Sequence, residues 1–227
     1  MDILELLELK KSFLSPDACL RPVIDIQRFN LPAGAQTAVM GESGLGKTTL
    51  LNLISGILAA DAGQILVGGR DMAKLSEAGR DKCRGRSIGY IHQTFNLLQG
   101  FSAIENVLLA MAFGRGMDPP RARALLDRVG LRDRLNDRPR QLSSGQQQRV
   151  AIARALANQP SLVLADEPTG HLDPANAREA LALIREVCAE TGAALLLVTH
   201  DREILAGFES VVSLAAMNRA MDSAKSA

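Results

Sequence analysis

One short stretch limits the possible folds of this chain more than any other feature. Residues 41–49 read Gly-Glu-Ser-Gly-Leu-Gly-Lys-Thr-Thr, which fits the phosphate-binding pattern of glycine, four residues, then Gly-Lys-Ser/Thr. An apolar run at 37–40 precedes the stretch, as in a buried strand, and apolar residues at helical spacing follow it as far as a stop at Gly56. Because the motif requires this strand–loop–helix context, we favour a phosphate-binding loop over a glycine-rich turn with a chance lysine.

Each part of the stretch has a chemical role in holding a phosphate chain. Glycines let backbone N–H groups approach the anion closely, and the helix that begins near Gly46 adds the positive end of its dipole. Lys47 supplies a mobile cation for the outer phosphates, and the Thr48 hydroxyl is placed to ligate magnesium. The binding residues expected here are Gly41, Glu42, Ser43, Gly44, Leu45, Gly46, Lys47, Thr48 and Thr49.

The composition narrows the class of protein around this site. The 227 residues, 47% hydrophobic and 22% charged, suit one globular domain with room for a subdomain. A net charge of +1 and the absence of tryptophan disfavour a general nucleic-acid binder. No apolar run approaches the ~18 residues of a membrane span, and no signal peptide is expected. Three scattered cysteines are expected to be incidental thiols in a reducing cytoplasm.

Short apolar runs between turn residues predict further strands. These runs lie at 20–29, 63–69, 87–93, 161–165 and 194–198. The first is expected at a sheet edge, because Pro22 cannot donate a hydrogen bond to a neighbouring strand. Residues 3–9 fit a helix as well as a strand, since their glutamates repeat every three positions.

Helices are expected mainly in the middle of the chain. Ser102 and Glu105 form a capping box before one helix, a break at 115–120 separates it from a second at 121–129, and Asp173 caps a third at 175–190. Residues from about 94 to 158 are therefore predicted to be a mostly helical insertion in an α/β core. The tail after residue 220 is predicted to be disordered.

Acidic residues and a histidine follow two of the predicted buried strands. Asp166 and Glu167 come directly after the strand at 161–165, and His200 follows the strand at 194–198. Because ligands bind beyond the carboxyl ends of parallel strands, we expect these side chains to face the phosphate loop. There Asp166 would hold magnesium through water, Glu167 would orient an attacking water, and His200 would reach the terminal phosphate. The alternative, a solvated acid pair that opens a loop, is disfavoured by the upstream motif.

A further stretch identifies the family that the chain resembles. Residues 142–146, Leu-Ser-Ser-Gly-Gln, are similar to the Leu-Ser-Gly-Gly-Gln signature of the ATPase subunits of ABC transporters, and they open a predicted helix. The other motifs occur in the family's order, so the resemblance covers nearly the whole chain. It implies one ABC ATPase domain over 1–227, with a P-loop NTPase (RecA-like) α/β core. An N-terminal antiparallel β subdomain and an inserted helical subdomain at about 94–158 would complete it.

The resemblance also assigns roles to individual residues. Phe13 matches the aromatic residue that stacks on adenine, and Asp173 falls in the loop that crosses the dimer interface. The implied catalytic residues are Glu167, His200 and Gln93, of which Gln93 also faces the permease. The implied magnesium ligands are Thr48, Gln93 and Asp166. The signature residues that would close on the nucleotide of a second subunit are Ser143, Ser144, Gly145 and Gln146.

Within the family, the chain looks most like the lipoprotein-releasing, macrolide-exporter and cell-division ATPases. This branch implies ATP and Mg²⁺, an ATP-dependent homodimer, and an integral-membrane permease with a large extracytoplasmic domain. It also implies a peripheral position on the cytoplasmic face of the inner membrane, and no nucleic-acid partner. The alternative is a soluble ABC ATPase that acts on DNA or ribosomes. Such proteins usually carry a coiled-coil insertion or two ATPase domains, and neither fits 227 residues. A P-loop kinase would not explain the signature.

Several positions depart from the family pattern. Ser144 replaces the first signature glycine, which is acceptable near a helix start, so activity is expected to survive. His171 stands where the branch usually has asparagine, and Phe13 replaces the commoner tyrosine. The usual C-terminal hairpin is not recognisable after His200.

An apolar cluster after Gln93 has two interpretations. Its members are Phe95, Leu97, Leu98 and Phe101. They either form a groove that contacts the permease or pack inside the helical insertion.

Overall fold

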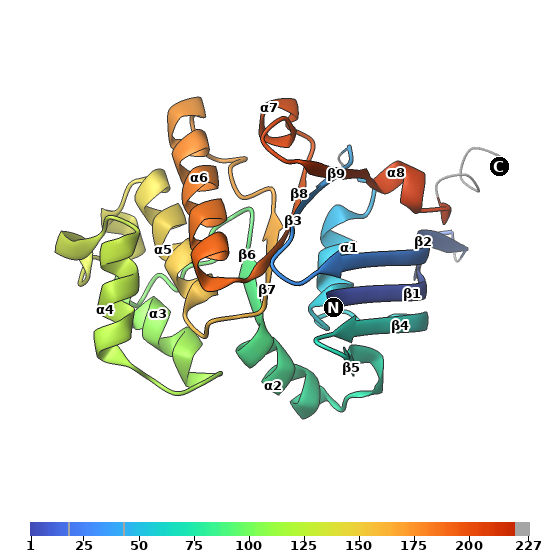
Figure 1. Cartoon of the computed structure of the whole chain (residues 1–227), viewed down its shortest axis with the longest axis horizontal. Helices are drawn as coiled ribbons and strands as arrows, with labels where there is room; N and C mark the ends of the chain where they lie inside the picture. The colour runs from blue at the N-terminus through green and yellow to red at the C-terminus, as the bar shows by residue number, and fades with distance from the viewer. Residues whose placement is uncertain (18, 43, 221–227) are drawn as a thin grey trace.

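Two sheets organise the computed structural model, which describes residues 1–17, 19–42 and 44–220. Ser43 and the tail predicted to be disordered lie outside the described residues. One sheet is antiparallel with the order β2-β1-β4-β5, and the other is parallel with the order β6-β7-β8-β3-β9. Figure 1 shows them side by side, with the antiparallel sheet at the right of the view. The predicted α/β core with an N-terminal antiparallel part is confirmed.

The N-terminal segment, left open between helix and strand, is a strand. The antiparallel strands are β1 (Asp2–Leu14), β2 (Leu20–Pro32), β4 (Ala62–Val67) and β5 (Arg70–Asp71). The three-residue spacing of the glutamates at 5 and 8, which suggested a helix, has a physical cause in this strand. The pairing of β1 with β4 shifts register between Leu7 and Lys10, and Glu8 there has a φ of 48°. Opposite it, Gly63 leaves no room for a Cβ, which would lie 2.4 Å from the Glu8 carbonyl oxygen. This bulge interrupts the two-residue alternation expected of a strand.

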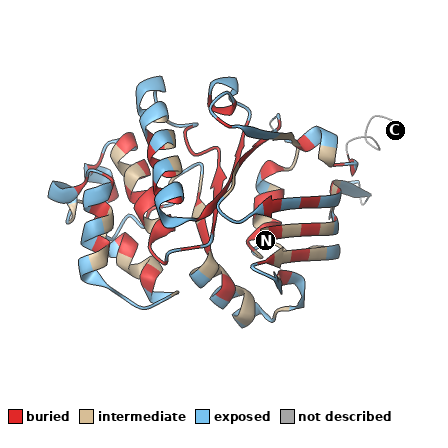
Figure 2. Cartoon of the chain, viewed as in Figure 1, coloured by how far each residue is buried: buried red, intermediate tan, exposed pale blue. Residues whose placement is uncertain are grey.

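The parallel sheet carries a hydrophobic core on each face. Its strands are β3 (Gln36–Met40), β6 (Ile88–Ile91), β7 (Leu162–Asp166), β8 (Ala194–Thr199) and β9 (Ser210–Ser213). Alternate residues of β7 point to opposite cores: Leu162 and Leu164 pack with the antiparallel sheet and α1, whereas Val163 and Ala165 pack with α3 to α6. The sheet is therefore buried on both faces, as the red central strands of Figure 2 show.

Most predicted helices are present, with some changed bounds. The longer helices are α1 (Lys47–Ile54), α2 (Glu77–Ser87), α3 (Ala103–Ala112), α4 (Pro119–Arg128), α5 (Ser144–Leu156) and α6 (Pro174–Thr191). The break predicted at 115–120 is too long, because Asp118 caps α4 and the prolines that follow occupy its first turn. The strand predicted at 87–93 is also too long, because Ser87 ends α2, a helix that the pattern did not indicate. No helix among the described residues is long and apolar enough to cross a membrane.

The C-terminal segment joins the sheet without forming a hairpin. Strand β9 pairs in parallel with β3, after the short helix α7 (Arg202–Leu205), and α8 (Leu214–Met217) follows. The buried side chain of Asn218 then donates to the Val23 carbonyl and accepts from the Asp25 N–H. These hydrogen bonds connect the segment that follows β9 and α8 to strand β2 of the antiparallel sheet.

Candidate functional site

The phosphate loop connects the carboxyl end of β3 to the start of α1. Gly44 and Gly46 have φ angles of 83° and 88°, which favour glycine. A Cβ on Gly46 would also lie 3.0 Å from a methyl group of Val23. Lys47 is the first residue of α1, and its ammonium is buried, donating to the carbonyls of Gly41 at 2.6 Å and Glu42 at 3.1 Å. The loop is therefore held in a curved shape around one cation.

The carboxylate of Glu167 joins two other predicted site residues. One of its oxygens lies 2.8 Å from Lys47 Nζ, and the other lies 2.8 Å from His200 Nδ1. Glu167 directly follows β7 in a left-handed conformation with a φ of 42°, and its backbone N–H donates to the Val198 carbonyl. A non-glycine residue held at positive φ is strained, and such strain is concentrated at functional sites.

The two neighbouring carboxylates have opposite electrostatic environments. Burial by itself would raise the pKa of Glu167, but hydrogen bonds from Lys47 and His200 outweigh it and keep that pKa below its usual value. Burial raises the pKa of Asp166, and the hydrogen bond from the Thr48 hydroxyl offsets only part of that effect. Glu167 is therefore held ionised, whereas no cation of the described residues forms an ion pair with Asp166 as Lys47 does with Glu167.

The donor set around Asp166 fits a magnesium ion. Thr48 already shares a hydrogen bond with the Asp166 carboxylate, and Gln93 lines the same cavity as Thr48. Hydroxyl, amide and carboxylate oxygens are the hard ligands that Mg²⁺ prefers. A bound dication would also offset the burial that raises the Asp166 pKa.

One cavity of about 500 Å³ is lined by Thr48 and Gln93, by the Lys47–Glu167–His200 group and by Phe13. Phe13 lies near the end of β1 and is 42% exposed. The structure thus brings the predicted site residues together at one cavity wall, namely Phe13, Lys47, Thr48, Gln93, Glu167 and His200. Residues 142–146 are not among the described residues that line it.

The signature stretch forms the start of α5 and lies apart from that cavity. The Ser143 side chain accepts from the Gln146 N–H, and the Gln146 side chain accepts from the Ser143 N–H, which makes a capping box. Ser143 and Ser144 are exposed, whereas Gly145 is buried, and a Cβ there would lie 2.9 Å from the Asn176 amide oxygen. An exposed helix start of this kind presents free N–H groups and a positive dipole end to the surroundings.

Asp173 has a structural role within this chain. Its carboxylate caps α6 by accepting from the backbone N–H groups of Ala175 and Asn176. Hydrogen bonds from the Asn176 side chain and backbone lower the Asp173 pKa. Asn176 also lies under Gly145, so the Asp173 loop and the signature stretch are in contact.

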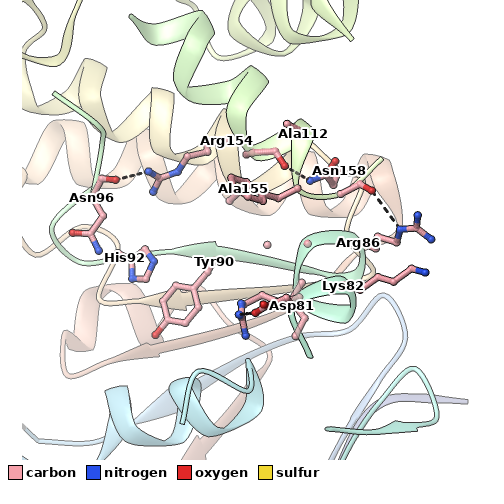
Figure 3. A pocket seen from close by; sticks show the side chains of 17 residues that line it. Asp81, Lys82, Arg86, Tyr90, His92, Asn96, Ala112, Arg154, Ala155 and Asn158 are labelled. Atoms are coloured by element: carbon pink, nitrogen blue, oxygen red, sulfur yellow. Dashed lines mark hydrogen bonds and ion pairs between the residues drawn. The ribbon is translucent and has the colours of Figure 1, made fainter. Parts of the chain in front are cut away.

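A second cavity, of about 840 Å³, lies between α2 and β6 on one side and α3 and α5 on the other (Figure 3). Tyr90 and His92 stack in it with ring centroids 4.1 Å apart. Arg154, from α5, donates to the carbonyls of Phe95 and Asn96, both of which have positive φ. Sequence reasoning missed this cavity, although Lys82 and Arg86, which line it, are four residues apart and so share one face of a helix.

Burial of His92 keeps its ring neutral in this second cavity. Burial first, and then the charge of Arg154, lowers the His92 pKa to about 4. Burial also raises the pKa of Tyr90.

The apolar cluster after Gln93 is partly buried and partly exposed. Leu97 is buried, and Phe95 packs partly against the same core. Leu98 and Phe101 are 44% and 43% exposed. His171 meets the Phe95 ring edge-on, with centroids 6.3 Å apart.

The chain is similar to known proteins over most of its length. The ABC transporter family matches residues 24–170. The lipoprotein-releasing system ATP-binding protein LolD 2 of Rhodospirillum rubrum is 43% identical over 210 residues, which cover 91% of this chain and 90% of that protein. The macrolide export ATP-binding/permease protein MacB of Syntrophobacter fumaroxidans is 42% identical over 209 residues, 90% of this chain but 29% of MacB. The dimeric ATP-binding cassette MJ0796, in a post-hydrolysis state bound to ADP and Pi, is 33% identical with a TM-score of 0.84, and the match covers 92% of this chain and 93% of that one.

Proposed function

The chain belongs to the ABC transporter family and is an ATPase, and from this premise we propose that two copies close around two ATP molecules to drive a separate membrane permease. The observation that carries the proposal is the position of Glu167. Its carboxylate stands between the loop lysine and His200, at the carboxyl end of a buried strand and at the wall of the phosphate-loop cavity.

Hydrolysis in this proposal depends on three side chains of the cavity. Lys47 binds the outer phosphates, and Glu167, ionised because Lys47 and His200 lower its pKa, orients and polarises the attacking water. His200 contacts the terminal phosphate from the end of β8. Thr48, Gln93 and Asp166 would hold magnesium, which would neutralise part of the phosphate charge.

The signature stretch supports the two-copy arrangement. The stretch is an exposed helix start, and its residues are not among those that line the phosphate-loop cavity of the same chain. A second copy related by two-fold symmetry would bring Ser143 and Gly145 to the nucleotide of the first. ATP would then receive charge-assisted hydrogen bonds from both copies, and loss of the γ-phosphate would loosen the dimer.

The permease is proposed to dock on the helices inserted after Gln93. Helices α3, α4 and α5 pack against one another and form the helical subdomain that we propose for about 94–158. The cavity of Figure 3 lies where these helices meet the core, and the exposed Leu98 and Phe101 lie on the segment between Gln93 and α3. Gln93, which lines the nucleotide cavity, would connect the phosphate state to this docking region.

The similarity to LolD 2 favours lipoprotein release as the process that the permease carries out. In that case the chain works at the cytoplasmic face of the inner membrane, with a permease that has a large extracytoplasmic domain. Macrolide export is the second candidate, supported by the similarity to MacB.

Co-expression with a candidate permease tests this proposal. Affinity purification of a permease encoded beside this chain should recover the chain, and hydrolysis by the complex should rise when a lipoprotein substrate is added. Stimulation by a macrolide instead would assign the chain to export. A complex that never forms, with hydrolysis stimulated by DNA or ribosomes, would favour the soluble ATPase.

A further inference from the structure

The end of strand β1 is fastened to the turn before β4 by one aspartate. Asp61 accepts from Lys11 Nζ at 2.7 Å through one carboxylate oxygen and from the Ser12 N–H at 2.6 Å through the other. Its own N–H donates to the Lys10 carbonyl at 2.9 Å. Asp61, which precedes β4, therefore forms hydrogen bonds with three consecutive residues of β1, Lys10, Lys11 and Ser12.

The lysine in this arrangement lies against an aromatic ring. Lys11 Nζ is 5.6 Å from the centroid of the Phe13 ring, within the range of a cation–π contact. The Lys11 side chain is only 14% exposed, so the ammonium has little freedom to leave this position. The hydrogen bond from Lys11 is the largest of the effects that lower the Asp61 pKa, so the Asp61 carboxylate stays ionised.

The ring that Lys11 contacts borders the nucleotide cavity. Phe13 is 42% exposed and lines that cavity together with Val23 and the phosphate loop. Phenylalanine has no hydroxyl through which a hydrogen bond could fix its orientation, so an exposed Phe13 ring would otherwise be free to change rotamer. A cation at one face restricts the ring and leaves the opposite face for a ligand.

We propose that Lys11 and Asp61 are positioning residues that hold the Phe13 ring with one face against the Lys11 ammonium and the other face ready to stack on the adenine of ATP. This inference rests on the proposed nucleotide site and adds two residues to it. It predicts that Lys11 and Asp61 affect the part of ATP affinity that comes from the base, without affecting the part that comes from the phosphates.

Binding of two probes separates these contributions. The probes are Mg-ATP and Mg-tripolyphosphate, which shares the phosphate chain but has no base, and their affinities are measured by titration calorimetry on the purified chain. Lys11→Met should weaken ATP binding about two- to fivefold and leave tripolyphosphate binding unchanged, since a cation–π contact to a partly exposed ring has about that strength. Asp61→Asn keeps an acceptor for the Ser12 N–H but loses the ion pair, and it should act in the same direction. Equal losses for both probes would overturn the proposal, because Lys11 would then act on phosphate or on folding.

Matched variants control for charge and stability. Lys10 is exposed and adjacent, so Lys10→Met removes the same charge and should leave both affinities unchanged. Lys11→Arg keeps a cation over the ring and should restore ATP affinity. Thermal melting should show that Lys11→Met and Lys10→Met unfold at similar temperatures.

Phe13→Ala distinguishes failure of this inference from failure of the nucleotide site. In that background Lys11→Met should cause no further loss of ATP affinity. If Phe13→Ala weakens ATP binding but Lys11→Met does not, the positioning role is wrong and the adenine platform stands. If Phe13→Ala itself has no effect, the adenine platform is wrong as well.

Discussion

The ammonium of Lys47 lies 2.8 Å from a carboxylate oxygen of Glu167, although the two residues come from different βα connections. Both side chains are almost fully buried, at 6% and 10% exposure. A buried charge is costly unless it is paired, and here the phosphate-binding cation and the proposed water-orienting carboxylate are paired with each other.

The first prediction concerns the charge on Glu167. Glu167→Gln keeps the size of the side chain but removes the carboxylate that orients water, so turnover should fall about a hundredfold or more while ATP still binds. Phosphate release and nucleotide titration measure the two quantities. Glu186→Gln, which changes an exposed carboxylate beside Arg128, should leave turnover unchanged. Near-normal hydrolysis by Glu167→Gln would remove Glu167 from the proposed role.

The second prediction concerns Lys47. Lys47→Ala removes a charge-assisted contact to phosphate, so nucleotide affinity should fall at least about tenfold. The change also leaves the buried Glu167 carboxylate with His200 as its closest partner, so its pKa should rise. Titration with Mg-ATP at neutral pH measures the loss, and affinity equal to that of the wild type would contradict the phosphate role of Lys47.

The third prediction concerns acid stability. The pKa of His92 is lowered to about 4 in the folded chain, so between that value and the ordinary value of about 6.5 the unfolded chain binds the extra proton. Stability should therefore fall as the pH falls through this window. His92→Phe keeps an aromatic ring beside Tyr90 and removes the titrating group. The pH-dependent loss of unfolding free energy that His92 causes, roughly 1–3 kcal/mol after allowance for partial exposure, should therefore disappear. Urea unfolding at pH 7 and pH 4.5 measures it, and parallel pH dependences in the two proteins would contradict it.

The fourth prediction separates the two parts of the apolar cluster. Leu98→Glu and Phe101→Glu change exposed side chains, so they should impair permease binding and leave basal hydrolysis and melting temperature unchanged. Leu97→Glu places a charge at a buried position and should destabilise the fold by roughly 3 kcal/mol or more. Pull-down with the permease and thermal melting distinguish them. Early melting of the Leu98 and Phe101 variants would place both residues in the core.

The sequence predicted the elements that depend on local chemistry. The phosphate loop, the capping box of Ser102 and Glu105 and the apolar strands β7 and β8 follow from short patterns, and so does the family assignment. The β1 strand could not be decided, because the bulge at Glu8 depends on the close approach of Gly63 from a distant part of the chain.

The features that could not be predicted from the sequence depend on contacts between segments that are distant along the chain. The hydrogen bonds from Arg154 to the carbonyls of Phe95 and Asn96 join α5 to the segment after β6, and only the fold brings these two parts of the chain together. The Asp61–Lys11–Phe13 arrangement likewise depends on the pairing of β1 with β4. The residue spacing within one segment cannot predict contacts of this kind.

The ATP-dependent dimer is the central claim, and light scattering tests it most directly. Glu167→Gln with saturating Mg-ATP should have twice the mass that it has with ADP, because both copies then hold an uncleaved γ-phosphate. Adding Ser143→Arg places a bulky side chain at the exposed start of α5 and should return the mass to that of a monomer, while nucleotide titration still shows ATP binding. A Glu167→Gln, Ser143→Arg protein that stays dimeric with ATP would contradict the account, because the copies would then associate through another surface.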